Sequence, residues 1–501
     1  MKKNFARFKK SFIFITILLL SLFLLNIFVS KKINSILEDK LGEKGFEFEG
    51  KFSTNILFGN IDLTEVKITK DSLFLKSNSI EVKGISYFKF LMNDVVTVNS
   101  IIIKNPLLSG KITKDIFKNK IEKDATSKKQ KDFKIGDFKI LNGSLNIVDE
   151  DLKNTKIKKL NIDFKDVVVD NKIKTAFPFS YNDVNIEVLD YHKKMSEIQE
   201  LNVDNISISK NQFTFNNLEI NPLKSEAEYD NYITEKKGLM SLKIQKIESP
   251  NFKMIALDSL SIYLEKLNVV DVNFEYFLDK TRYPTSNKYK KLYSKALREL
   301  PFHLKVDQID IINSKLIYKE LTDKEKEQGV LVFDDLNVSI KGIDNDKKNK
   351  TDTEVNIQTN FMGTSPLDIK YNFAINNLQD KFRIRGTLKN VTSKNMSSYI
   401  SPALHVKMEG FINRMDFDFE GNESISNGEF NIDFKNFKVK ILNEKRELDK
   451  ILSFLANIFV KDSAKDGVVI VDVENIERNK TKSFWNFFWL NIKKGLQESL
   501  L

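Results

Sequence analysis

The chain has 501 residues, no cysteine and a formal net charge of +11 at pH 7. The lack of cysteine excludes disulfides, thiolate metal sites and a cysteine nucleophile. The three histidines, His192, His303 and His405, lie about a hundred residues apart, so we expect no metal site and no cofactor. Only eight of the 80 basic residues are arginine, which base-reading interfaces favour, so we expect no nucleic-acid partner.

The N-terminus has the pattern of a membrane anchor. Five basic residues lie within residues 1–10, and the run over 11–30 is almost entirely apolar. Such a run, at about 1.5 Å per residue, spans close to 30 Å, the thickness of a bilayer core. It is longer than the core of a cleaved signal peptide, and Phe28-Val29-Ser30 is not a small-x-small cleavage site. We therefore predict an uncleaved single-pass anchor with a cytoplasmic tail, the rest of the chain being exported.

A short helix and then strands are predicted after the anchor. Residues 31–41 place apolar side chains on one helical face, and Gly42 and Gly45 can end that helix. From Phe46 onward apolar and polar residues alternate through most of the chain, and many of the 40 phenylalanines belong to this alternation. Alternation of this kind is typical of strands with one apolar face.

One spacing recurs within this pattern and is clearest in Ile135–Asp149. An apolar residue is followed by apolar residues at +3 and +5, by asparagine at +7 and by another apolar residue at +10. Because Asn-Gly suits a type I′ turn, we predict a hairpin that closes at Asn142-Gly143. The spacing returns at Val98–Leu108, where Asn105-Pro106 needs a different turn, and at Val306–Leu316.

The repeated spacing predicts a duplication. Asn142 and Asn313 are 171 residues apart, and Leu160 and Leu336 are 176 apart. We therefore expect duplicated units near 98–170 and 306–346, inside a repeating strand domain that covers 31–445.

Two segments interrupt the strands. Residues 279–300 carry apolar side chains at helical spacing and are expected to form a helical insertion that packs on the sheet or serves as a lid or partner helix. Residues 446–501 are expected to form a cap of amphipathic helices. Lysines flank an aromatic group there, a composition that suits either a membrane interface or a cap on an apolar groove: Phe484, Trp485, Phe488 and Trp489.

The chain resembles the AsmA-like family, which is related to the chorein-type bridge-like lipid-transfer proteins. The similar features are the membrane helix, the amphipathic helix that ends at Leu41-Gly42, and the pattern Gly59-x-Ile61-x-Leu63-x-x-Val66-x-Ile68. Ser100–Leu108 and the tail Lys438–Leu501 also resemble that family. The resemblance implies a bacterial envelope protein, anchored in the inner membrane with most of its chain in the periplasm.

The alternation alone leaves the fold open, because half-apolar strands also form sandwiches whose faces cover each other. The helical ends argue against an outer-membrane barrel. The resemblance implies an elongated, open, antiparallel β-groove of taco-like repeats. The residues expected to line it are Ile101, Ile103, Phe138, Ile140, Leu145, Ile147, Leu160, Ile162, Phe164, Ile309, Ile311, Leu316, Leu336, Val338 and Ile340.

A groove of this kind implies a protein that binds or conducts phospholipid between membranes. The alternative is a non-carrying envelope scaffold or regulator that assists outer-membrane protein assembly through an outer-membrane or other envelope partner. We expect no enzyme, because no nucleophile–base pair, phosphate loop or clustered metal ligands stand out in the sequence.

Overall fold

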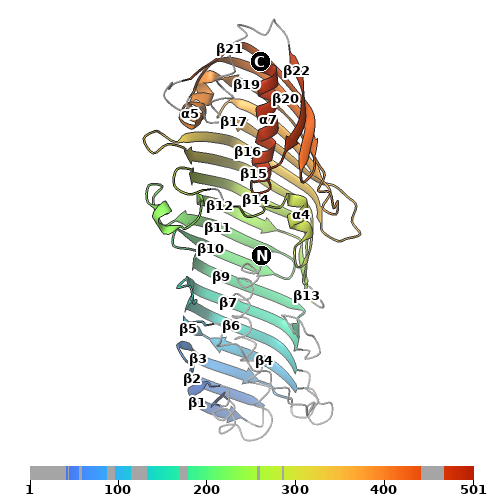
Figure 1. Cartoon of the computed structure of the whole chain (residues 1–501). Coiled ribbons are helices and arrows are strands. Elements are labelled where there is room, and N and C mark those ends of the chain that lie inside the picture. Colours follow the sequence, from blue (N-terminus) through green and yellow to red (C-terminus); the bar gives the residue numbers. More distant parts are fainter. Residues whose placement is uncertain are drawn as a thin grey trace. The chain divides into compact units, whose positions relative to one another are not determined.

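A computed structural model describes residues 41–500, apart from 43–44, 56–58, 87–95, 114–132, 170–178, 257–259, 285–286, 405 and 442–467 (Figure 1). The described residues contain 22 strands and few helices, so the prediction of a mainly β, mostly antiparallel protein is confirmed. They divide into two compact units. Unit 1 comprises residues up to 194, 202–214 and 255–260, and unit 2 comprises 195–201, 215–254 and the chain from 261 onward.

Several predicted segments lie outside the described residues: the tail and anchor over 1–30, most of the helix over 31–41 and the first helix of the predicted cap. No helix among the described residues is long and apolar enough to cross a membrane.

Unit 1 is a single sheet in which β4 and β5 run parallel to β6 and the other pairings are antiparallel. Its strands are β1 Glu47–Asn55, β2 Asn60–Lys70, β3 Leu73–Lys83, β4 Val96–Lys104, β5 Leu107–Lys111, β6 Phe133–Val148, β7 Asn154–Val169, β8 Phe179–Ser180 and β9 Asp183–Lys194. Three further strands are divided between the units: β10 Gln199–Ser209, β11 Phe213–Pro222 and β13 Phe252–Ala256. The first residue of β14, Leu260, also belongs to unit 1, and the rest of that strand belongs to unit 2.

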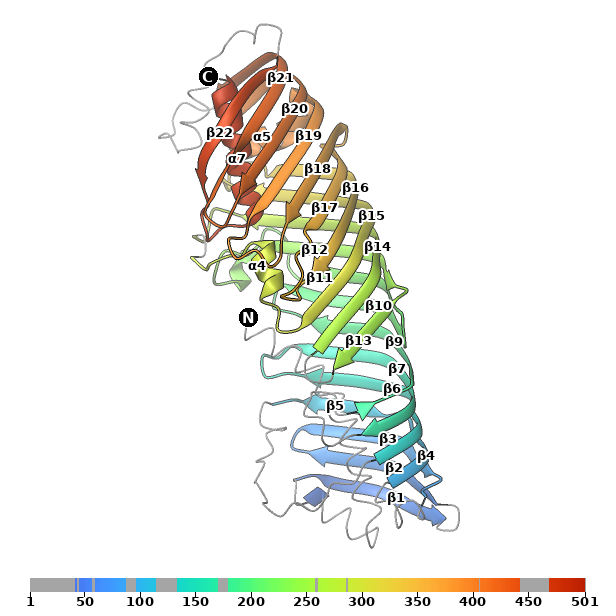
Figure 2. The same cartoon turned by 90° about the vertical axis from the view of Figure 1, so that its right-hand side faces the viewer.

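Unit 2 is also a sheet of consecutive strands, stacked side by side in Figure 2. Its strands are β12 Leu239–Ser249, β14 Leu260–Asp279, β15 His303–Leu321, β16 Gly329–Asp344, β17 Thr353–Phe361, β18 Ser365–Phe373, β19 Phe382–Thr392, β20 Val406–Gly421, β21 Ile425–Ile441 and β22 Val469–Glu477. β14 and β15 are parallel, whereas β12 with β14 and each neighbouring pair from β15 to β22 are antiparallel. The helices are η2 Tyr229–Tyr232, α4 Tyr293–Arg298, α5 Ser393–Leu404 and α7 Phe484–Leu500.

The parallel pairs explain where the strand pattern is interrupted. A parallel pair cannot be closed by a tight turn and needs a long crossover connection. Residues 112–132 connect β5 to β6, and residues 280–302, which include α4, connect β14 to β15. The helix in the second connection is shorter than the sequence predicts. Lys290 bonds through its backbone N–H to the Lys480 carbonyl (2.8 Å) and through its carbonyl to Arg478, so these groups are not available to a longer helix.

The predicted hairpin at Asn142-Gly143 is wrong. β6 is one continuous strand from Phe133 to Val148, and the chain turns only at residues 149–153. Asn142 has a left-handed backbone (φ 53°) and forms a bulge, marked by register shifts against β7 on both sides of Gly143. An Asn-Gly pair suits this bulge for the same reason that it suits a turn, because asparagine tolerates positive φ.

The bulges explain the recurring spacing. In a regular strand, residues three apart point to opposite faces. In β6, however, Ile135, Phe138, Ile140 and Leu145 are all buried in the apolar clusters of unit 1. The alternation shifts by one residue beside Gly136, which lies opposite left-handed Asp166, and shifts again at Asn142. After each shift the apolar side chains return to the buried face. The spacing therefore predicts correctly that these residues share a face, although the element is a single strand.

The same geometry recurs in unit 2, as the predicted repeat requires. Asn313 in β15 is left-handed (φ 53°) and lies between register shifts, like Asn142. The Asn142 N–H donates to the Asn161 side chain (2.8 Å), and the Asn313 N–H donates to the Asn337 side chain (3.2 Å). Left-handed Gly342 in β16 corresponds in spacing to Asp166 in β7. The first strand of each hairpin also pairs in parallel with an earlier strand, β6 with β4 and β15 with β14.

The predicted helix end before β1 is present. The Phe46 N–H bonds to the Leu41 carbonyl and the Gly45 N–H to the Gly42 carbonyl (both 2.8 Å), and Gly45 is left-handed (φ 73°). This is the Schellman arrangement, in which a glycine in the left-handed region ends a helix. Leu41 is buried in the apolar cluster of unit 1 and Phe46 packs against that cluster.

The bulge can be tested at Asn142. A β-branched side chain in the left-handed region costs about 1–2 kcal/mol, whereas glycine tolerates it. We expect Asn142→Val to lower the free energy of unfolding by about that amount and Asn142→Gly to leave it nearly unchanged. Chemical denaturation of the full chain measures the difference, and equal loss in both variants would contradict a left-handed Asn142.

Candidate functional site

The apolar side chains of unit 1 form continuous rows across the strands. Residues paired across neighbouring strands are Phe52, Leu63, Ile80, Ile103, Ile140, Ile162 and Ile186 in one row, and Ile61, Val82, Ile101, Phe138, Phe164 and Val184 in the next. A third row runs through Leu75, Leu108, Leu145 and Ile157. Seven of the nine predicted unit 1 residues lie in these rows. Ile147 and Leu160 occupy the same strands, and Leu160 lies opposite Gly143 at the bulge.

The unit 1 rows are a packed interior. Ile101, Phe138 and Ile140 are between 0% and 1% exposed, and Leu41 joins them in one cluster with Phe46 at its edge. Ile147 and Phe164 are half-buried and pack against the two clusters. The structure thus brings together the nine predicted residues of this unit, most of them with very little exposed surface.

Unit 2 carries equivalent rows with more exposed surface. One row pairs Ile247, Val269, Ile311, Val338 and Ile357 across β12 and β14–β17, and the next pairs Leu267, Ile309, Ile340 and Val355. Every member of both rows is half-buried. Of the other predicted residues, Leu316 lies between Phe274 and Phe333, and Leu336 lies opposite Ser314 at the bulge. We name the two paired rows over β12 and β14–β17 the half-buried rows.

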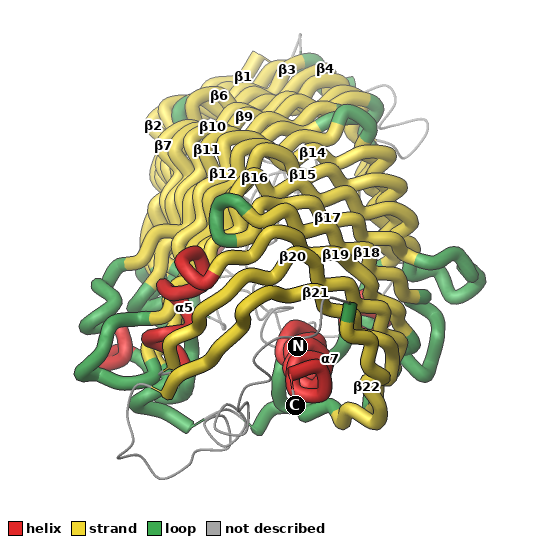
Figure 3. Tube along the Cα trace, turned by 90° about the horizontal axis from the view of Figure 1, so that it is seen from above, coloured by secondary structure: helices red, strands yellow, loops and turns green. Residues whose placement is uncertain are grey.

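The half-buried rows belong to a single-layer sheet. Among the described residues of unit 2, the elements with extensive contacts to β15 and β16 are their neighbouring strands and α5, and no second sheet lies against them. A β-sandwich, which the alternation alone left open, would place a second sheet there. The strands of this unit curve along their length, and α7 lies on the concave side (Figure 3).

The helix α7 covers the rows where they continue into β18–β21. The Phe484 ring lies 4.6 Å from Tyr371 and 5.2 Å from Phe382, and the Phe488 ring lies 5.1 Å from Phe417, as measured between centroids. Burial raises the pKa of Tyr371, so its hydroxyl stays neutral beneath the helix. The aromatic rows of these strands are therefore occupied by the chain itself.

Two buried details fix the position of α7. The Ser426 hydroxyl on β21 donates to the Asn491 side chain (2.9 Å), and both residues are almost fully buried. A Cβ on Gly495 would come within 2.3 Å of the Phe430 ring, so only glycine allows the helix this close to the sheet. Sequence reasoning missed Asn491 and Gly495, although a glycine inside an amphipathic helix was a usable signal of close packing.

The predicted cap residues face two ways. Phe484 is buried and Phe488 half-buried against the sheet, whereas Trp485 and Trp489, about a quarter turn around α7, are 43% and 42% exposed. The sequence offered a groove cap and a membrane interface as alternatives for these four aromatic residues. The phenylalanines pack as a groove cap would, and the exposed tryptophans are compatible with a membrane interface.

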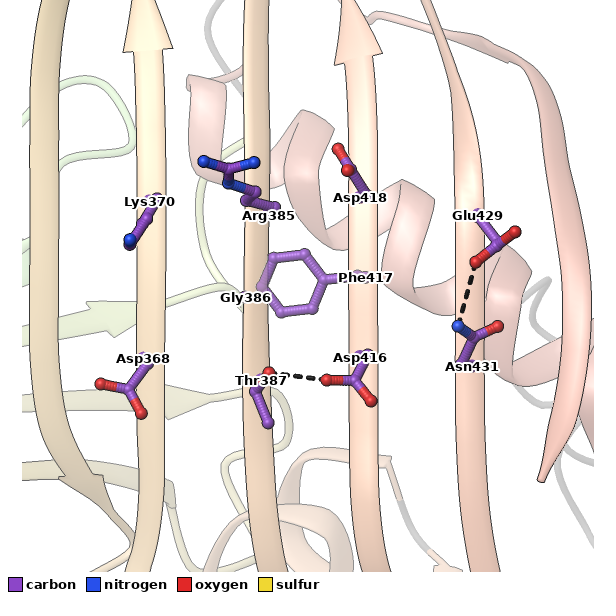
Figure 4. A pocket seen from close by; sticks show the side chains of 10 residues that line it. All are labelled: Asp368, Lys370, Arg385, Gly386, Thr387, Asp416, Phe417, Asp418, Glu429 and Asn431. Atoms are coloured by element: carbon purple, nitrogen blue, oxygen red, sulfur yellow. Dashed lines mark hydrogen bonds between the residues drawn. The ribbon is translucent and has the colours of Figure 1, made fainter. Parts of the chain in front are cut away.

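The polar face of β18–β21 carries a shallow depression of about 330 Å³ (Figure 4). Asp418 is held by a two-pronged bond from Arg383 (2.8 and 2.7 Å), and Asp416 accepts from Thr387 (2.6 Å). Burial opposes ionisation of Asp416, but hydrogen bonds from Arg414 and Thr387 outweigh it and lower the pKa. A carboxylate with a lowered pKa is a weak base toward a hydroxyl, so this depression has the character of an ordered polar surface.

Each of the two described histidines has its own hydrogen-bond partner. The His192 ring bonds to Asn202 (2.8 Å) in unit 1, the His303 ring bonds to Asp344 (3.0 Å) in unit 2, and His405 lies outside the described residues. No group of three or more histidine, aspartate or glutamate side chains among the described residues could hold a metal ion.

Comparison with protein-family models, curated proteins and solved structures finds no match to this chain. The apolar rows and α7 are therefore interpreted from their own geometry.

The fit of α7 on the sheet can be tested at Gly495. In an exposed helix, Gly→Ala stabilises by about 1 kcal/mol. Here we expect Gly495→Ala to destabilise by about 1–3 kcal/mol, because the added methyl group meets the Phe430 ring. Both tryptophans of the chain lie on α7, so tryptophan emission during denaturation reports on this helix directly.

The matched control is Gly42→Ala, since Gly42 is helical and nothing lies within 4 Å of its Cβ position. A stabilising effect of alanine at both glycines would show that α7 does not rest on Phe430.

Proposed function

We propose that this chain binds phospholipid through its apolar face, in an open β-groove, and carries the lipid between membranes. The observation that carries the proposal is the pair of half-buried rows in unit 2. One row runs without a polar interruption across five neighbouring strands of a single-layer sheet, β12 and β14–β17, and the other runs across four of them, β14–β17. An apolar surface of this extent, over which the described residues place no second layer, is typical of a binding surface for an apolar ligand.

The chemistry of the rows suits acyl chains. Each methylene kept from water is worth about 0.8 kcal/mol, so a sixteen-carbon chain meets a barrier of roughly 12 kcal/mol in water. Isoleucine, valine and leucine side chains on successive strands would lower this barrier without any reaction. A lipid that slides along such rows with its head group in water needs no specific pocket and no catalytic residue.

Two expectations from the sequence support the same function. The apolar run over 11–30 would tether the chain to the inner membrane, with the bulk of it in the periplasm. The resemblance to AsmA-like proteins implies an open groove and lipid transport. Both remain proposals, as does the absence of catalytic activity.

A non-carrying envelope scaffold is the second candidate, and the burial in unit 1 favours it. Phe138 and its neighbours have the exposure of an ordinary core, so in that unit the rows stabilise the fold whether or not lipid is carried. A scaffold would act through an envelope protein partner and would not depend on the half-buried rows.

The two candidates can be separated at adjacent residues of β15. Ile311 belongs to the half-buried rows, whereas Ile312 is 44% exposed on the opposite face. Cells supplied with a photoactivatable fatty acid would be irradiated, and lipid adducts on β14–β17 peptides of the full chain counted by mass spectrometry. We expect Ile311→Glu to reduce adducts at least about tenfold, since a penalty of 1.4 kcal/mol already gives that factor.

Ile312→Glu is the control, because it adds the same charge one residue away and should leave the adducts unchanged. A wild-type chain without adducts on these strands, or equal loss in both variants, would refute lipid binding by the rows and leave the scaffold.

The two units should respond differently to a buried charge. Phe138→Glu places a carboxylate in a closed cluster, and we expect it to lower the free energy of unfolding by more than about 4 kcal/mol. Ile311→Glu should cost about 1 kcal/mol, because water reaches a half-buried site. Denaturation midpoints of the two variants provide the comparison, and a similar large loss for both would show that the unit 2 rows are also a closed core.

A further inference from the structure

The outer side of α7 presents exposed aromatic residues. Trp485 and Trp489 are one turn apart on the helix and are 43% and 42% exposed. Tyr293 of α4, 42% exposed, lies near them: its ring is 5.9 Å from the Phe484 ring, which in turn lies 5.4 Å from the Trp485 ring. Exposed large aromatic side chains that cluster in this way mark interaction surfaces.

Four lysines lie near one another: Lys236, Lys280, Lys290 and Lys482. Lys482 precedes Trp485 by three residues, and Lys290 precedes Tyr293 by three. The segment before α4 is joined to the segment before α7 by the bond from the Lys290 N–H to the Lys480 carbonyl (2.8 Å). The Lys236 ammonium lies 3.4 Å from the Lys280 carbonyl. Burial and the positive charges of the other three lysines lower the pKa of Lys482, and burial and Lys280 lower that of Lys236.

Nearby carboxylates offset only part of this charge. Lys280 is paired with buried Glu320, and Asp279 lies near Lys236 while accepting hydrogen bonds from Thr281. Glu235 pairs with Lys288, and Glu423 bonds to the Tyr289 hydroxyl. The surface therefore combines crowded positive charge with exposed aromatic rings.

We propose that this surface, formed by Trp485, Trp489, Tyr293 and the four lysines, docks on a bilayer that contains anionic phospholipid. Tryptophan and tyrosine rings favour the depth of the head groups, and each lysine near an anionic surface strengthens binding about fivefold. A nucleic acid fits less well, because three arginines of the region are already engaged. Asp230 pairs with Arg282, Asp380 pairs with Arg298, and backbone carbonyls bind Arg478. The tryptophans lie about a quarter turn around α7 from Phe484 and Phe488, which pack on the sheet, so a carrier and a scaffold could both use this surface.

The two tryptophans make the test specific, because the chain has no others. The full chain would be held in phosphatidylcholine nanodiscs and mixed with acceptor vesicles of phosphatidylcholine, with or without one quarter phosphatidylglycerol. We expect flotation with the anionic vesicles and a blue shift of the tryptophan emission, with much weaker binding to pure phosphatidylcholine.

The variant Lys236→Gln/Lys290→Gln/Lys482→Gln should lose on the order of a hundredfold in affinity for the anionic vesicles. Lys280 is left in place, since its removal would leave Glu320 buried without its partner. The control Lys347→Gln/Lys348→Gln/Lys350→Gln removes the same charge from the exposed loop between β16 and β17 and should bind normally.

Equal loss in both triple variants would overturn the proposal, since it would show attraction to net charge alone. Flotation without a change in tryptophan emission would place the contact elsewhere on the chain. Displacement of the protein from vesicles by inorganic phosphate at constant ionic strength would assign the lysines to a small anion instead. None of these outcomes depends on whether the half-buried rows carry lipid.

Discussion

The left-handed residues inside the long strands are the constraint on which the structure of each unit depends. A strand of sixteen residues with strict alternation would place Ile135 and Phe138 on opposite faces. The shift at Gly136 returns them to one face, and the bulge at Asn142 does the same for Ile140 and Leu145. The Asn161 side chain secures the bulge by accepting the Asn142 N–H. Asn313 and Asn337 repeat this device in unit 2. Without it, a strand of this length would divide its apolar residues between two faces.

A single sheet with one apolar face must cover that face, and the two units do so to different degrees. In unit 1 the rows form a cluster with almost no exposed surface. In unit 2 the chain covers β18–β21 with its own helix, and each well-buried phenylalanine such as Phe484 or Phe487 contributes about 1.5–3 kcal/mol to holding it there. The cover does not include the half-buried rows of β12 and β14–β17, and this difference is why the candidate site falls there.

The sequence predicted which residues share a face better than it predicted where the chain turns. The spacing placed Phe138, Ile140 and Leu145 together correctly, because burial requires apolar residues wherever the backbone points them inward. The turn at Asn142-Gly143 was wrong, because one dipeptide satisfies both a type I′ turn and a left-handed bulge. The pairing of β6 with its partner strand decides between a turn and a bulge, and a local sequence pattern does not show which distant segments pair.

The aromatic residues of α7 are a second case in which the sequence identified the residues but not their contacts. Composition identified Phe484, Trp485, Phe488 and Trp489 as a group, but a linear pattern cannot tell which side of a helix meets a sheet and which meets solvent. That choice is made by Gly495, whose missing side chain admits the Phe430 ring, and by Asn491, which bonds to Ser426. These two contacts join residues 65 positions apart, so they exist only once β21 and α7 have met. Because the phenylalanines pack against the sheet, the tryptophans that follow them in the sequence are exposed to solvent. The outward aromatic surface is thus a geometric consequence of how the cap packs.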